Sequence, residues 1–251
     1  MNSITTLVSI IIPSFNNIEN LKECIRSIDN QVYDNYEVWI IDNKSTDGTE
    51  DFIKTLQAPF YWVFEKDLGV YDAMNKGVQK ANGDWLYFLG CDDRLFNSLT
   101  LENLFKIINI PEKTDLVIGR VQYDLYGDES YFLRRKGGIT SPVVSRKLWA
   151  INTMHHQAIF YRKEIFDKLI FSLKYKILSD YDFNIKLFKS GVNELIINDI
   201  IAICKTQGLS KKYNWNLYKE EIEFKTANSS IFLKPLFYIL GLAKYFIKKS
   251  I

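Results

Sequence analysis

Short apolar runs alternate with helix-like segments through the first part of the chain, and this alternation constrains the fold more than any other feature. The runs span residues 7–12, 36–41, 60–65 and 85–89. Between the first two runs, Leu21, Ile25 and Ile28 recur at the spacing of one helix face. Strands that alternate with helices build a mostly parallel sheet, whose buried strands are continuously apolar. The sequence therefore predicts an α/β fold with a mostly parallel sheet flanked by helices.

The pattern changes after Thr114, where aromatic residues become frequent in the expected strands. Further strands are predicted at 117–125, 130–133, 158–161 and 195–203, and a helix at 181–188. This half is less regular than the first, so it is the weaker basis for assigning a site.

Composition excludes some classes of partner. The chain has 32 basic and 30 acidic residues and a formal net charge of +2, which is too small to favour nucleic acid as a partner. Its 3 cysteines are odd in number and far apart, which favours reduced thiols in the cytoplasm. The first apolar run is short and lacks the basic start of a signal peptide. We expect a cytoplasmic protein that does not bind nucleic acid.

Polar residues follow three of the expected strands. They are 13–16 (Pro-Ser-Phe-Asn), 42–48 (Asp-Asn-Lys-Ser-Thr-Asp-Gly) and 90–93 (Gly-Cys-Asp-Asp). Any one of them would be ordinary turn and cap chemistry. In open parallel sheets, however, ligands bind beyond the carboxyl ends of the strands. Three polar clusters at strand ends therefore favour a ligand site there.

Several segments resemble family 2 glycosyltransferases of the GT-A fold. They are residues 8–16, 41–49, 67–77 and 83–93, with shorter matches at 156–157, 160–162 and 179–182. The resemblance implies an enzyme that moves one sugar from a nucleotide diphosphate sugar, preferably a UDP-sugar, to an acceptor hydroxyl with inversion. It further implies a role in bacterial surface polysaccharide synthesis, such as O-antigen (lipopolysaccharide) or capsule, with a glycan or lipid-linked glycan as acceptor.

The resemblance implies contacts with the nucleotide sugar at named positions. These are Pro13, Ser14, Phe15, Asp42, Asp67, Asp72, Asn75, Asp92 and His156. Pro13, Ser14 and Phe15 are expected to form the wall against the base, because a flat aromatic beside a backbone turn suits a base. For Phe15 the alternative is a buried aromatic at a strand end. Asp42 is expected to accept a hydrogen bond from the base or ribose.

The resemblance places Asp67, Asp72 and Asn75 beside the sugar and diphosphate. Asp72 and Asn75 are three residues apart on a predicted helix, so they share one face. Asp72 is equally well explained as a solvated helix charge. His156, which precedes Gln157, is expected to touch the diphosphate or acceptor, and a structural histidine is an equally good interpretation.

Asp92 and Asp93 are the candidate metal ligands. A hard ion bound to a diphosphate needs few protein carboxylates, so Mn²⁺ or Mg²⁺ fits and zinc does not. Similar proteins often carry an aspartate two positions earlier, where this chain has Gly90. We expect one carboxylate to bind the ion and the other a ribose hydroxyl, without assigning which. The alternative is an Asp-Asp helix cap.

Asp180 is the candidate catalytic base. An inverting transfer requires a carboxylate near the acceptor hydroxyl that accepts its proton. Similar proteins often read Glu-Asp here, whereas this chain has Ser179 before Asp180. Asp182 is a rival, although it is better placed to cap or face the following helix.

Two other functions are compatible with parts of the pattern. A nucleotidyltransferase that makes nucleotide sugars typically has an early glycine-rich basic loop, which residues 13–17 lack. A degenerate glycan- or nucleotide-binding protein is disfavoured because the three candidate aspartates are retained. Two loops are weaker site candidates: basic residues 134–136 for a lipid phosphate, and 208–212 as a closing loop over the donor.

The C-terminal residues 226–251 are expected to form an amphipathic helical segment after a glycosyltransferase domain at 1–225. That domain is expected to comprise a nucleotide-sugar-binding half (1–110) and an acceptor half (111–225). Lys234, Pro235 and Lys244 interrupt the apolar run, so it is more suited to lying on a membrane than to crossing one. The protein is therefore expected in the cytoplasm, peripheral to the inner face of the plasma membrane. The alternative is a final helix packed on the domain.

Overall fold

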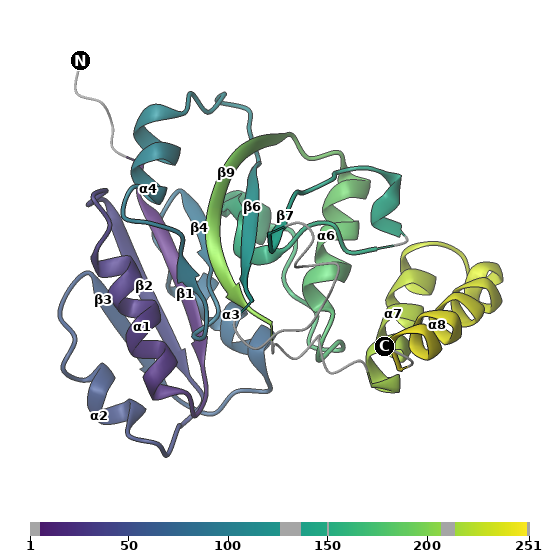
Figure 1. Cartoon of the computed structure of the whole chain (residues 1–251), viewed down its shortest axis with the longest axis horizontal. Helices are drawn as coiled ribbons and strands as arrows, with labels where there is room; N and C mark the ends of the chain where they lie inside the picture. Colours follow the sequence, from purple (N-terminus) through teal and green to yellow (C-terminus); the bar gives the residue numbers. More distant parts are fainter. Residues whose placement is uncertain (1–5, 126–136, 150, 207–213, 250–251) are drawn as a thin grey trace.

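The computed structural model describes residues 6–125, 137–149, 151–206 and 214–249, which form an α/β fold (Figure 1). One sheet runs in the order β3-β2-β1-β4-β8-β6-β9-β5, and β7 pairs with β6. Its strands are β1 (Val8–Ser14), β2 (Tyr36–Asp42), β3 (Phe60–Phe64), β4 (Trp85–Phe88), β5 (Arg94–Leu95), β6 (Leu116–Asp124), β7 (Ile139–Thr140), β8 (Ile159–Arg162) and β9 (Glu194–Lys205). The predicted fold class is confirmed. The loops predicted at 134–136 and 208–212, and the strand at 130–133, lie outside the described residues.

Helices cover both faces of this sheet. They are α1 (Ile18–Asp29), α2 (Thr49–Ile53), α3 (Val70–Lys80), α4 (Thr100–Glu102), α6 (Ser179–Ser190), α7 (Trp215–Asn228) and α8 (Lys234–Lys249). Short turns of 3₁₀ or π helix are η1 (Asn103–Ile107), η2 (Arg146–Trp149), η3 (His156–Ala158), η4 (Lys163–Asp167) and η6 (Ile231–Leu233).

The first four strands are parallel, because the three connections between them each return the chain to the same end of the sheet. Every residue of β1 is buried, as expected for a strand covered on both faces. Alternation along β1 sends Ile10 and Ile12 toward α1, whereas Ile11 packs toward α3 and α6. The register pairs Ser14 with Asp42, so the polar residues that follow β1 and β2 begin at the same edge.

The second half of the sheet is mixed. β8 is antiparallel to β4, with Tyr87 opposite Phe160, and it is antiparallel to β6 as well. The start of β8 therefore lies at the carboxyl end of β4. The preceding turn, η3, carries His156 and Gln157 to the same edge as the loops after β1 and β4.

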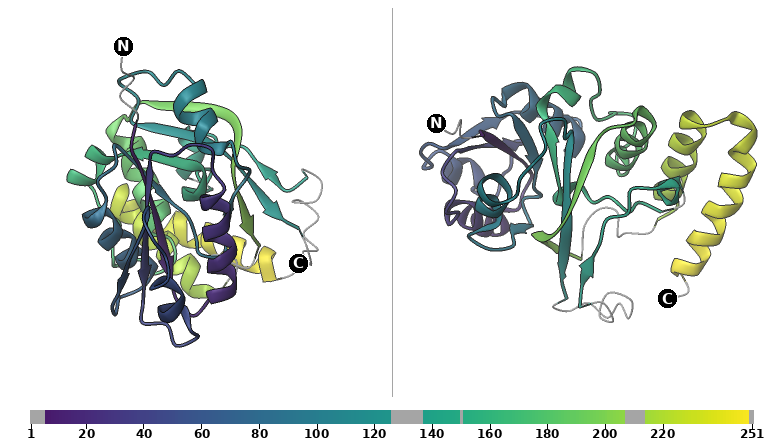
Figure 2. Two further views of the ribbon diagram at one scale, coloured as in Figure 1. Left: turned by 90° about the vertical axis from the view of Figure 1, so that its left-hand side faces the viewer. Right: turned by 90° about the horizontal axis from the view of Figure 1, so that it is seen from above.

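α7 and α8 pack on each other at the end of the molecule opposite β3 (Figures 1 and 2). Trp215 of α7 contacts the rings of Tyr238 and Tyr245, and Glu221 pairs with Lys225 and Lys244. The predicted C-terminal helical segment is thus present, although the predicted boundary after residue 225 falls inside α7. None of the helices in the described ranges is long and apolar enough to cross a membrane.

Candidate active site

A cavity of about 730 Å³ lies beyond the carboxyl ends of β1, β2, β3 and β4. This volume is in the usual range for small-molecule sites. The cavity brings together eight of the residues predicted from sequence: Pro13, Ser14, Phe15, Asp67, Asp92, Asp93, His156 and Asp180. Residues from both halves of the chain therefore meet in one space, as the strand-end argument predicts.

Pro13, Ser14 and Phe15 form one wall of this cavity. Phe15 is 56% exposed, so it is not the buried aromatic considered as its alternative. Ser14 is buried, and its hydroxyl has no hydrogen-bond partner among the described residues. Asp67 accepts a hydrogen bond from the Gly69 amide, and burial raises the pKa of its carboxyl. The wall thus offers an aromatic face beside polar groups.

Three predicted donor contacts do not line the cavity. Asp42 is fully buried, and its two oxygens accept from the Ser45 amide and hydroxyl, each at 2.7 Å. Asp72 accepts from the Leu68 amide. These carboxylates hold the turns that shape the wall, and their direct contact with a donor stays a prediction.

Asn75, the third, binds the backbone of Phe171. Its amide nitrogen donates to the Phe171 carbonyl at 2.9 Å, and its oxygen accepts from the Phe171 amide at 3.0 Å. This reciprocal pair fixes α3 against the segment before α6, so Asn75 supports the cavity from behind.

Asp93 lines the cavity but is almost completely buried. Its Oδ2 accepts from Gln157 Nε2 at 3.1 Å and its Oδ1 from the Lys205 amide at 3.0 Å. Burial, followed by the neighbouring Asp92 charge, raises the pKa of Asp93 to about 6. Asp93 therefore joins the loop after β4 to η3 and to the end of β9.

Asp92 is half-buried and lines the cavity. The loop folds back so closely that a Cβ on Gly90 would lie 2.7 Å from Asp93 Oδ2 and 3.0 Å from Asp92 Oδ1. A side chain at position 90 would have to displace both carboxylates. This crowding gives a steric reason for the glycine where similar proteins often have an aspartate.

These residues fit a divalent ion that takes most of its ligands from a bound diphosphate. Within the described ranges, no group of three or more His, Cys, Asp or Glu side chains could hold a metal unaided. Both carboxylates line the cavity, but each oxygen of Asp93 already accepts a hydrogen bond within the protein. One carboxylate plus phosphate and water suits Mg²⁺ or Mn²⁺. The geometry makes Asp92 the better candidate ligand.

Asp180 lies in the first turn of α6, where the helix dipole favours a carboxylate. Its Oδ2 is 3.1 Å from His156 Nδ1, and its Oδ1 is 2.9 Å from the Tyr71 hydroxyl. Burial alone would raise the pKa of Asp180, but the hydrogen bond and charge of His156 outweigh it and the pKa is lowered. The carboxylate is thus ionised at neutral pH.

Asp182, the rival base, faces away from the cavity. It is 1% exposed and binds Lys186 Nζ and Asn228 Nδ2, each at 2.6 Å. The Asn228 bond ties α6 to α7, so Asp182 has a structural role.

Several cavity residues are not among those predicted from sequence. Tyr71 directly precedes the predicted Asp72 on α3. A search of the helix face opposite Asp72 could have found it from the sequence. Gln157 enters the sequence argument only as the neighbour of His156. Lys176 and Lys205 also line the cavity, with their ammonium groups donating to the Leu68 carbonyl and to Asn20 Oδ1, but no local pattern marks either.

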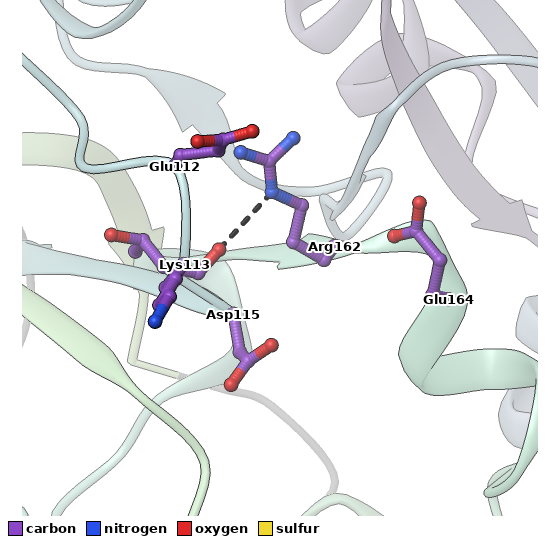
Figure 3. Close-up of a pocket in the computed structure, with 6 residues that line it drawn as sticks. Glu112, Lys113, Asp115, Arg162 and Glu164 are labelled. Atoms are coloured by element: carbon purple, nitrogen blue, oxygen red, sulfur yellow. Dashed lines mark hydrogen bonds between the residues drawn. The ribbon is translucent and has the colours of Figure 1, made fainter.

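A second, shallow hollow of about 330 Å³ lies at the opposite edge of the sheet (Figure 3). Arg162 Nε donates to the Thr114 carbonyl at 3.1 Å, and its guanidinium lies 4.3 Å from the Trp85 ring. Arg162 at the end of β8 pairs with Trp85 at the start of β4, which is far from the strand ends that form the main cavity. The packing of Arg162 against Thr114 and Trp85 therefore accounts for the hollow.

Solved structures share this fold. Staphylococcus aureus TarS, residues 1–349, in complex with UDP-GlcNAc matches with a TM-score of 0.67 and 17% identity, over 88% of this chain and 66% of that chain. The mannosyltransferase PcManGT from Pyrobaculum calidifontis, in complex with GDP-Man and Mn²⁺, matches with a TM-score of 0.63 and 19% identity. This match covers 95% of this chain and 69% of that chain. The chain thus spans about two thirds of each. Fold and site together define a GT-A-type protein.

Sequence comparison narrows this class to a family. The model described as "Glycosyl transferase family 2" matches residues 9–170. A PGL/p-HBAD biosynthesis glycosyltransferase of Mycobacterium bovis is 39% identical over 189 residues, which cover 73% of this chain and 70% of that protein. A second relative, from Methanococcus voltae, is 30% identical over 262 residues, which cover 94% of this chain and 77% of that protein. It is named dolichyl N-acetyl-alpha-D-glucosaminyl phosphate 3-beta-D-2,3-diacetamido-2,3-dideoxy-beta-D-glucuronosyltransferase. The chain belongs to glycosyl transferase family 2, which confirms the resemblance.

Proposed function

We propose that this glycosyltransferase moves one sugar from a nucleotide diphosphate sugar to an acceptor hydroxyl, with inversion at the anomeric carbon. One observation carries the proposal: a single cavity is lined by Asp92 and by the Asp180–His156 pair. The first group suits a departing diphosphate, and the second suits an attacking hydroxyl. An inverting transfer needs both, on opposite faces of the sugar.

The donor is proposed to be a UDP-sugar, bound with its base along the wall formed by Pro13, Ser14 and Phe15. The exposed Phe15 ring supplies the face for a base. The UDP-GlcNAc complex of TarS supports UDP, whereas the GDP-Man complex of PcManGT shows that the fold admits another nucleotide.

The cofactor is proposed to be Mn²⁺ or Mg²⁺. Asp92 would hold the ion, with Asp93 fixing the loop beneath it, and the Mn²⁺ in the PcManGT complex supports this assignment. When bound, the ion would neutralise charge that develops on the diphosphate. Lys176 and Lys205, which line the same cavity, would add positive charge from the protein.

The acceptor is proposed to be a glycan or lipid-linked glycan of a bacterial surface polysaccharide pathway, such as O-antigen or capsule. The names of the two relatives support a glycoconjugate acceptor: one acts in PGL/p-HBAD biosynthesis and the other on a dolichyl phosphate sugar. We assign the first 110 residues to donor binding and residues 111–225 to the acceptor, since His156 and Asp180 come from the second range.

The C-terminal segment is proposed to rest on the cytoplasmic face of the plasma membrane. Its exposed apolar side chains include Phe232 at 88%, Ile239 at 63% and Phe246 at 60% exposure. An amphipathic helix with such a face partitions into the membrane interface, where aromatic rings settle at headgroup level. Lipid-linked acceptors would be delivered to the same surface.

A panel of nucleotide sugars tests the proposal. Purified protein should hydrolyse or transfer from at least one of them with Mn²⁺ or Mg²⁺ and lose that activity in EDTA. A protein that forms nucleotide sugar from a sugar phosphate and nucleoside triphosphate would instead be a nucleotidyltransferase. One that binds nucleotide sugar without turnover would be a degenerate binding protein.

A further inference from the structure

The carboxylate of Glu220 binds three consecutive backbone amides just before α6. Its Oε1 accepts from the Lys176 amide at 2.7 Å, and its Oε2 accepts from the Ile177 and Leu178 amides at 2.8 and 3.1 Å. These three residues belong to no helix or strand, so no regular ladder satisfies their amides. Glu220 comes from α7, which lies between α6 and α8 (Figure 2). A helix from the C-terminal part of the chain therefore supplies the acceptor that fixes this segment.

The same three residues line the cavity, and two of them also bind the chain around the start of α3. The Lys176 ammonium donates to the Leu68 carbonyl at 3.1 Å, and the Ile177 carbonyl accepts from the Tyr71 hydroxyl at 2.7 Å. Leu68 lies in the turn before α3, and Tyr71 lies in the first turn of α3. The segment thus bridges α7 to a helix whose first residues line the cavity.

The segment also fixes the start of the helix that carries Asp180, the candidate base. The Leu178 carbonyl accepts from the Asp182 amide at 3.0 Å in the first turn of α6. The Tyr71 hydroxyl, which holds the segment from α3, lies 2.9 Å from Asp180 Oδ1. Two connections therefore lead from Glu220 to the base, one through the backbone of α6 and one through Tyr71.

We propose that Glu220 is a positioning residue for the transfer reaction, holding residues 176–178 so that Asp180 faces the acceptor hydroxyl. The inference rests on the proposed function and adds to it a residue that touches neither substrate. Rates depend steeply on alignment, and a displacement of about 1 Å from a remote change can cost about 100-fold. By this account α7 is part of the support of the active site as well as the partner of α8.

Hydrolysis of a nucleotide sugar by Glu220 variants tests the proposal. Because the acceptor is unidentified, the probe is the nucleotide sugar that the wild-type protein hydrolyses best, with water in the acceptor's place. Glu220→Ala should lower kcat per folded molecule by about 10- to 100-fold, because residues 176–178 lose their common acceptor. UDP affinity, measured by calorimetry, should change by less than about twofold, because Phe15 and Asp92 keep their places.

Glu223→Ala is the matched control on the same helix. Glu223 pairs with Lys174 of the same preceding segment at 3.3 Å, but both side chains are largely exposed and the pair binds no backbone amide of residues 176–178. An exposed ion pair contributes little. Glu223→Ala should therefore hydrolyse the nucleotide sugar as fast as wild type.

Two further variants separate positioning from stability. In Glu220→Gln the remaining carbonyl oxygen can still accept from the Ile177 and Leu178 amides, so kcat should lie between those of wild type and Glu220→Ala. Tyr71→Phe removes the hydroxyl that holds Ile177 and keeps the ring. It should lower kcat less in the Glu220→Ala background than in wild type, because both residues act through one segment. A residue that served stability alone would show no such coupling in kcat per folded molecule.

Amide hydrogen exchange gives a readout that does not depend on turnover. The amides of residues 176–178 should exchange about tenfold or more faster in Glu220→Gln than in wild type. If Glu220→Ala does not fold, Glu220→Gln carries the kinetic test. Wild-type kcat in the folded Glu220 variants, or purely additive effects with Tyr71→Phe, would overturn the inference and leave the proposed function standing. A wild-type protein that neither binds nor hydrolyses any nucleotide sugar would overturn the proposed function, and the inference with it.

Discussion

The side-chain amide of Gln157 donates a hydrogen bond to Asp93 Oδ2 across 3.1 Å. Its neighbour His156 contacts Asp180 Oδ2 at the same distance of 3.1 Å. One dipeptide in η3 therefore touches both acidic centres of the cavity. This short turn, which the antiparallel β8 brings to the carboxyl end of β4, therefore sets the position of the Asp93 carboxylate relative to that of Asp180.

Gln157→Ala should destabilise the protein, because it leaves the buried Asp93 carboxylate without one of its donors. An unsatisfied buried partner costs about 1 to 3 kcal/mol, which denaturant unfolding would measure. Gln79→Ala, at an exposed position on α3, is the matched control and should change stability by less than about 0.5 kcal/mol. Equal effects of the two variants would show that the Gln157 contact contributes nothing to the fold.

The pKa of Asp93 predicts a pH effect on stability in metal-free protein. Its folded-state pKa is raised to about 6, above the ordinary aspartate value of 3.8, so the folded state holds the proton more tightly. Stability from this group is present below about pH 4 and is lost as pH rises toward 6. Asp93→Asn should therefore gain about 1 to 3 kcal/mol relative to wild type between these pH values in EDTA. A constant difference across that range would contradict the assignment.

Asp180→Asn and Asp182→Asn should separate chemistry from structure. Asp180→Asn should lower kcat by about 100- to 10,000-fold with donor affinity nearly unchanged, because an amide cannot accept the proton of the acceptor hydroxyl. Asp182→Asn should instead lower the unfolding free energy by about 1 to 3 kcal/mol and leave turnover per folded molecule intact. An active Asp180→Asn with an inactive Asp182→Asn would reverse the two roles.

Apolar residues of the C-terminal segment should govern binding to lipid. Deleting the segment would also strip α7 of its partner, so point variants are the cleaner test. The double variant Phe232→Ser, Ile239→Ser should lose most sedimentation with anionic liposomes at low salt. Ile170→Ser, which removes a comparably exposed apolar side chain elsewhere, is the control. Wild-type protein that ignores the liposomes would contradict membrane docking.

Local sequence patterns predict the parallel half of the fold and the edge at which the cavity lies. Continuous apolar runs identify buried strands such as β1, and polar residues after them mark the ligand edge, because both depend on neighbours in sequence. The strand ends therefore lead to Phe15 and Asp92 from the sequence alone. The resemblance adds Asp180, which no local pattern singles out.

The partners of these residues could not be predicted, because long-range packing decides them. Asp42 looks like a ligand-facing carboxylate in sequence, yet the chain turns back so that Ser45 occupies both of its oxygens. Asp93 and Asp92 are equivalent in sequence, and only the approach of Gln157 and β9 buries one and leaves the other facing the cavity. Nothing in the sequence near Tyr71 marks it as a site residue. Only the fold brings its hydroxyl within 2.9 Å of Asp180 Oδ1.

The central claim is a metal-dependent nucleotide site at Asp92, and calorimetric titration of UDP and GDP tests it most directly. The wild-type protein should bind at least one nucleotide in Mn²⁺ and bind it about tenfold or more weakly in EDTA, a difference of about 1.4 kcal/mol or more. Asp92→Asn should show the weak affinity in both conditions while unfolding at the same temperature as wild type. Affinity that is unchanged by EDTA, or an Asp92→Asn variant that still responds fully to Mn²⁺, would contradict the account.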